Sequence, residues 1–87
     1  MARLRQETVV AVYWYDTWGA TTGWTHIDDL DKGYCNVTSV GIILKNANRG
    51  HVTLVQSWTD SDSLDNVLHI PTVNVISITE IGRCTIG

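Results

Sequence analysis

Hydrophobic and polar residues alternate along most of this chain with the period of two that is typical of β-strands. The pattern predicts strands over residues 8–15, 34–45, 51–58, 66–70 and 74–81. Segments rich in Gly, Asn, Asp and Ser separate them, as expected of turns. The longest such segment spans 17–33, and within it Thr25 followed by Asp28 and Asp29 favours one helical turn, because it combines an N-cap residue with acids in the first turn.

The last two predicted strands are separated by Pro71, which cannot extend a strand ladder and favours a tight 3₁₀ turn. A strand, a Pro-led turn and another strand after a long bent hairpin is the arrangement that closes a small five-stranded barrel. A chain of 87 residues forms one domain, 1–87, with a modest core. The pattern therefore predicts a single all-β domain with a long loop between its first and second strands.

The segment 39–81 resembles the SH3-like or Sm-like barrel. The resemblance is carried by VGIIL at 40–44, HVTLV at 51–55, LHIP at 68–71 and VISI at 75–78. Within it, Gly41 stands where a strongly bent strand needs a missing side chain. The resemblance implies a five-stranded SH3-like/Sm-like small barrel.

The whole chain also resembles a group of short bacteriophage proteins of unassigned role. The shared residues are VYWYD at 12–16 with Trp24, SVG at 39–41, VTLVQSW at 52–58 and HIP at 69–71. Several phage proteins of this size are oligomeric sponges that sequester the cyclic nucleotide signals of bacterial defence systems. The resemblance implies a comparable role in the cytoplasm of a host cell.

The aromatic residues are four Trp and three Tyr with no Phe, so every ring carries a hydrogen-bonding group. Such rings suit interfaces and stacking sites, and they also fill the cores of strand-rich proteins. Alternation along 13–15 predicts Trp14 on one face of its strand and two tyrosines on the other. Trp18 and Trp24 bracket a loop of Gly and Thr residues that is either a connector or a cradle for phosphate oxygens.

Polar residues beside these rings complete a predicted ligand site. Gln56 and Ser57 precede Trp58 on an otherwise apolar strand, where they either pair with backbone or contact the edge of a base. Arg49, in a turn, either binds a phosphate or is solvated. The predicted ligand-binding residues are Trp14, Asp16, Trp18, Thr22, Trp24, Arg49, Gln56, Ser57, Trp58 and His69.

Charge and motifs narrow the classes of function. The net charge of −3 disfavours binding to duplex nucleic acid. We find no nucleophile elbow, P-loop or metal motif, so we expect no catalysis, cofactor or metal site. No apolar run is long enough to cross a bilayer and no secretory leader is visible, which favours a cytoplasmic protein without a membrane partner. Cys35 and Cys84 are expected as free thiols, although a disulfide between them is conceivable.

The leading hypothesis is a non-enzymatic homo-oligomer that sequesters a small, cyclic nucleotide at an inter-subunit pocket. Exposed Trp residues and open strand edges favour the assembly. Two alternatives stay open, namely a protein-binding module that inhibits a host defence enzyme and an Sm-like RNA-binding ring.

Overall fold

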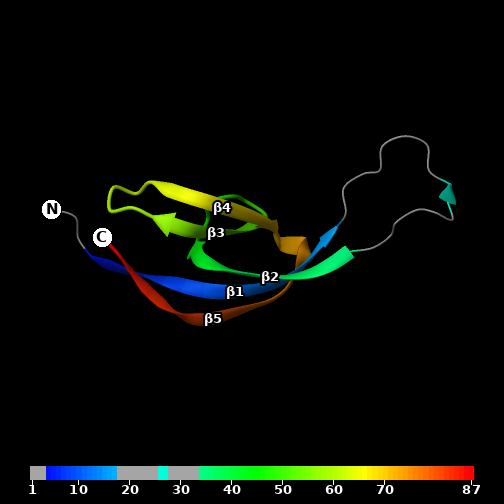
Figure 1. The fold of residues 1–87 in the computed structure, drawn as a ribbon, viewed down its shortest axis with the longest axis horizontal. Helices are drawn as coiled ribbons and strands as arrows, with labels where there is room; N and C mark the ends of the chain where they lie inside the picture. Colours follow the sequence, from blue (N-terminus) through cyan, green and yellow to red (C-terminus); the bar gives the residue numbers. More distant parts are fainter. Residues whose placement is uncertain (1–3, 18–25, 28–33) are drawn as a thin grey trace.

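The computed structural model describes residues 4–17, 26, 27 and 34–87 (Figure 1). Its strands are β1 (Arg5–Thr17), β2 (Tyr34–Leu44), β3 (His51–Trp58), β4 (Leu64–Pro71) and β5 (Val75–Ile86). A 3₁₀ turn, η2 (Thr72–Asn74), joins β4 to β5 where Pro71 predicts it. The all-β prediction and the order of the five strands are confirmed. Most of the predicted helical turn at 25–30 lies outside the described residues.

The five strands form one antiparallel sheet in the order β4-β3-β2-β1-β5. Most of β2 pairs with β1, whereas only its last three residues, 42–44, pair with β3. β2 therefore connects two halves of the sheet, and in Figure 1 it bends between the β1–β5 pair and the β3–β4 hairpin. The core lies between these halves and contains Val10, Val12, Trp14, Leu54 and Ile70.

Gly41 lies where β2 passes from β1 to β3, since it pairs with Val10 of β1 directly before residues 42–44 pair with β3. A Cβ atom at this position would lie 3.1 Å from the Cβ of Leu54 and 3.2 Å from the carbonyl oxygen of Val55. Such contacts are tighter than a side chain normally makes in a packed interior. The absence of a side chain thus lets β3 approach β2 closely at this point.

The phase of β1 is as predicted. Trp14 is 8 % exposed and faces the core, whereas Tyr13 on the opposite face is 39 % exposed. The Trp14 indole is satisfied there, since its Nε1 donates a hydrogen bond to Ser39 Oγ at 3.0 Å. An aromatic ring with a hydrogen-bonded N–H group therefore forms part of the core at this position.

The sheet is open among the described residues, because β4 and β5 do not pair with each other. The predicted barrel closure is therefore not confirmed. Both edge strands expose large apolar side chains, 37–41 % exposed on β4 and 44–54 % on β5. These side chains are Leu64, Val67 and Leu68 on β4, and Ile76, Ile78 and Ile81 on β5.

The two cysteines are free, as expected. Cys35 pairs across the sheet with Asp16, and Cys84 pairs with Glu7 near the other end of β1. At about 3.3 Å per residue the two positions on β1 are roughly 30 Å apart, whereas a disulfide needs Cα atoms within about 7 Å. The alternative of an intrachain disulfide is therefore wrong.

An ion pair ties the β3–β4 turn to the start of β1. Arg5 Nη2 donates to Asp62 Oδ1 at 2.6 Å, and Trp58 Nε1 donates to the same oxygen at 2.8 Å. The Arg5 guanidinium also lies over the Trp58 ring, 5.0 Å from its centroid. We call these three residues the Asp62 clamp. It joins the two halves of the sheet at the end opposite η2 (Figure 1).

The Asp62 clamp makes the stability of the fold depend on pH in the acid range. The hydrogen bond from Arg5, and then that from Trp58, hold the pKa of Asp62 below its ordinary value. Because the folded-state pKa is lowered, the stabilisation is complete above the ordinary carboxyl pKa of about 3.9 and is lost as the pH falls through the lowered folded value. We expect Asp62→Asn to unfold at a lower urea concentration than wild type at pH 7, with the difference vanishing by about pH 2.

The substitution keeps the backbone, since Asp62 has a φ of 62° and Asn also tolerates this region. Asp60→Asn, which removes the same charge from the same turn, is the control and should change the urea midpoint little at either pH. Equal shifts for both variants would show that net charge, and not the clamp, sets the acid sensitivity.

Candidate functional site

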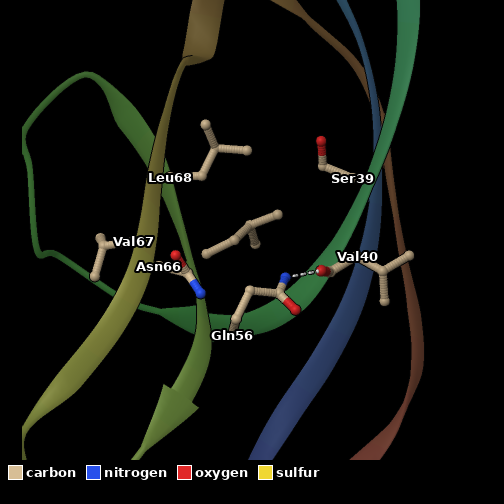
Figure 2. Close-up of a pocket in the computed structure, with 7 residues that line it drawn as sticks. Ser39, Val40, Gln56, Asn66, Val67 and Leu68 are labelled. Atoms are coloured by element: carbon tan, nitrogen blue, oxygen red, sulfur yellow. Dashed lines mark hydrogen bonds between the residues drawn. The ribbon is translucent and has the colours of Figure 1, made fainter.

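A pocket of about 370 Å³ opens between β2, β3 and β4. This volume lies within the range of small-molecule sites, about 300–1,000 Å³. We call it the β2–β4 pocket. It is lined by Ser39 and Val40 from β2, by Leu54 and Gln56 from β3, and by Asn66, Val67 and Leu68 from β4 (Figure 2).

The apolar part of the pocket comes from alternation along β3 and β4. Leu54 is 1 % exposed and pairs across the sheet with Leu68, so the two side chains lie on the same face. Leu68 is 39 % exposed, because β4 has no neighbour on its outer side among the described strands. Figure 2 shows Leu68 and Ser39 on opposite sides of the pocket. The pocket thus has a buried apolar floor and an open mouth.

Two amide side chains lie at one end of the pocket. Gln56 Nε2 donates to the carbonyl oxygen of Val40 at 2.6 Å, which fixes the orientation of this amide because a carbonyl only accepts. Asn66 lies between Asp65 and Val67, whose partners are Ser57 and Val55, so it stands across from Gln56 (Figure 2). The backbone of Asn66 has a φ of 54°, a left-handed conformation that Asn tolerates better than most residues.

Ser39 adds a hydroxyl group to the pocket, and this hydroxyl is hydrogen-bonded to a core residue. Because the indole N–H of Trp14 only donates, Ser39 Oγ is the acceptor of their 3.0 Å hydrogen bond and keeps its own hydrogen for another acceptor. Trp14 therefore lies directly behind the pocket wall. Its fluorescence is a natural reporter of events at Ser39.

The pocket lining is uncharged. None of its seven residues is Asp, Glu, His, Lys or Arg. A phosphate gains most from charged or N–H donors, and these seven residues offer no cation to one. The lining instead suits a flat, neutral group with hydrogen-bonding atoms along one edge.

The predicted site residues are spread over the described structure. Gln56 lines the β2–β4 pocket, and Trp14 lies behind it through Ser39. Trp58 belongs to the Asp62 clamp. Trp18, Thr22 and Trp24 lie outside the described residues, so their predicted loop site is not described.

The other four predicted site residues lie away from this pocket. Asp16 is near the end of β1 and Arg49 is in the exposed turn before β3, where its carbonyl oxygen accepts from His51 Nδ1 at 2.9 Å. Ser57 lies on the strand face opposite Gln56. His69 shares that opposite face, and its Nδ1 forms a 2.8 Å hydrogen bond with the hydroxyl of buried Thr53.

Sequence reasoning missed most of the pocket. Ser39, Asn66 and Leu68 belong to no ligand-binding motif, and they meet only because β2, β3 and β4 pair as they do. The one local signal is Asn66, since Asn is depleted from strands and is enriched where φ is positive.

The chain matches no protein-family model, no curated protein and no solved structure. Within residues 4–17, 26, 27 and 34–87, no three His, Cys, Asp or Glu side chains are grouped so that they could hold a metal ion. Among the same residues, no helix has the length and apolar character needed to cross a membrane.

Proposed function

We propose that this protein is a non-catalytic binder of a small nucleotide, with the base held in the β2–β4 pocket. One observation carries the proposal: a buried apolar floor at Leu54 lies beside two amides, Gln56 and Asn66, in a pocket without charged lining. An apolar surface with a few fixed polar groups is the usual composition of a small-molecule site. Nucleobases present the complementary chemistry, with apolar faces and hydrogen-bonding edges.

The phosphates of such a ligand would take their cation from outside the pocket lining. The pocket opens beside β4, which is an open edge of the sheet, and the other open edge, β5, carries Arg83. Pairing β4 of one copy with β5 of the next would place a strand bearing Arg83 next to the pocket. We therefore propose a homo-oligomer in which the pocket lies at the subunit boundary.

The exposed apolar side chains of both edges support this assembly. Unpaired edges with exposed Leu, Ile and Val are sites where strands from other chains add. Since β4 and β5 are different surfaces, their pairing is heterologous and either closes as a ring or grows as a filament. Such pairing would also complete, between copies, the sheet that a single chain leaves open.

The biological role that we propose is sequestration of a cyclic nucleotide immune signal in the host cytoplasm. Its support is the resemblance of 12–16, 39–41, 52–58 and 69–71 to short phage proteins together with the pocket's suitability for a base.

Isothermal titration with cyclic dinucleotides, cyclic trinucleotides and cyclic ADP-ribose isomers tests the proposal. We expect at least one ligand to bind with a Kd of about 1 μM or below, as a drug-sized pocket permits. Gln56→Ala should weaken that ligand about tenfold, because a lost hydrogen bond at a formed site is worth about 1 kcal/mol or more. Ser57→Ala, the neighbouring residue on the opposite strand face, is the matched control and should bind as wild type does. The absence of heat with every ligand would reject the proposal.

A second function is favoured by the same open edges. A protein-binding module that inhibits a host enzyme would dock its partner on the apolar side chains of β4 or β5. This alternative predicts that the protein, when free of nucleotide, inhibits a purified host enzyme stoichiometrically. The third alternative, an RNA-binding ring, predicts affinity that falls steeply with salt, and the net charge of −3 disfavours it.

A further inference from the structure

The hydrogen-bonding groups of the β2–β4 pocket distinguish between purine bases. We infer that the pocket selects adenine over guanine, an inference that rests on the proposed nucleotide-binding function. It depends on which donors and acceptors the lining residues present and on which charged groups they lack.

Gln56 presents an acceptor with a fixed direction. Its Nε2 must face the carbonyl oxygen of Val40, so its Oε1 cannot exchange places with the nitrogen without losing the 2.6 Å hydrogen bond. An acceptor held in this way suits the exocyclic amino group of adenine, which donates. The O6 and N7 edge of guanine has two acceptors, so it would place partial negative charge next to the partially negative Gln56 Oε1.

Asn66 presents both a donor and an acceptor across from Gln56. Its Nδ2 can donate to the ring nitrogen beside the amino group of adenine while Gln56 Oε1 accepts from that amino group. Asn and Gln amides are the usual partners of adenine for this reason. Ser39, on the other side of the pocket, adds one hydroxyl hydrogen for a further acceptor on the ligand.

The groups that proteins use to select guanine are missing from the lining. Arg and Lys donate to O6 and N7 of guanine, and a carboxylate is the acceptor suited to its N1–H and N2 amino groups. The seven lining residues include neither a cation nor a carboxylate. A guanine that used its O6 and N1 edge against the two amides would need a further acceptor for its N2 amino group, which adenine does not need, and an amino group left without an acceptor costs binding free energy.

The apolar floor of the pocket does not distinguish adenine from guanine. Leu54 and Leu68 offer apolar contact to the face of any base. These contacts supply affinity, and the amides supply the selection.

The test is titration of the full chain with adenosine, guanosine and adenosine monophosphate, followed by Trp fluorescence or heat. We expect adenosine to bind about tenfold more tightly than guanosine, at the low end of the discrimination that amide contacts give. Adenosine monophosphate should bind within about threefold of adenosine in the single chain, since no cation lines the pocket.

Asn66→Asp sharpens the test, because it replaces the donor with a carboxylate and preserves a residue that tolerates a φ of 54°. We expect it to weaken adenosine about tenfold and to narrow or reverse the preference over guanosine. Asn66→Gly, which keeps the backbone and removes the amide, should weaken adenosine and leave little preference. Ser57→Ala is the control with wild-type selectivity.

Two results would overturn the inference in distinguishable ways. If guanosine binds as tightly as adenosine while Gln56→Ala still weakens both, the selection is wrong and the nucleotide-binding function stands. If neither these three compounds nor any of the cyclic nucleotides binds, both the selection and the proposed function are wrong.

Discussion

Gly41→Val is expected to destabilise the protein by about 1–3 kcal/mol and to weaken ligand binding at the β2–β4 pocket. Even a Cβ at this position lies 3.1 Å from the Cβ of Leu54 and 3.3 Å from Nε2 of Gln56. The two methyl groups of Val extend further into the same contact, so β3 must move away from β2. That movement separates Gln56 from the carbonyl of Val40 and opens the pocket wall.

Gly82→Val is the matched control, because a Cβ at Gly82 meets nothing within 4 Å. Val is favoured in strands and Gly is not, so this variant should be neutral or slightly more stable than wild type, by about 0.5–1 kcal/mol at most. Urea unfolding of both variants measures the difference. Equal stabilities would show that the close approach of β3 to β2 does not depend on the missing side chain at Gly41.

Ile70→Ala is expected to cost about 2–5 kcal/mol of unfolding free energy. Ile70 is fully buried at 0 % exposure and packs in the core with residues of β1 and β3. Truncation removes buried apolar surface and leaves a cavity that the surrounding strands fill only partly. A domain of this size has a total stability of about 5–15 kcal/mol, so the loss is a large fraction of it.

Ile78→Ala removes the same atoms from a position that is 44 % exposed on β5, and it should cost well under half as much in the isolated chain. Urea unfolding at low protein concentration measures both values. If Ile78→Ala becomes costly only as the concentration rises, the edge of β5 is covered by another copy, as the proposed assembly requires. Equal losses at low concentration would contradict the placement of these two side chains.

The strands and their faces follow from local sequence. Alternation along 8–15 predicts β1 and places Trp14 on the face opposite Tyr13, and Pro71 predicts the 3₁₀ turn before β5. These features depend on residues that are close along the chain, where side-chain period and fixed φ decide the conformation. His69, which Leu68 and Ile70 flank on the same strand, is exposed, as the alternation predicts.

The candidate site follows from pairing between distant segments. Asn66 meets Gln56 only through the register of β3 with β4, and Ser39 reaches the same pocket through the bend of β2. The Asp62 clamp joins residues 5 and 62, and Gln6 Nε2 donates to Thr85 Oγ1 at 2.7 Å across almost the whole chain. Sequence periodicity predicts which face of a strand a residue occupies. It does not predict which other strand lies beside that residue.

By itself the sequence determined an all-β chain, the succession of five strands along it and the opposite faces of Trp14 and Tyr13 on the first strand, because these arise from local steric preference and the period of side chains. Only the tertiary structure decided that the sheet stays open between β4 and β5, that Cys35 and Cys84 are far apart, and that two neutral amides share a pocket. The physical reason is that strand pairing is a balance of long-range burial and loop closure over the whole chain. A local sequence pattern therefore cannot predict which strands pair.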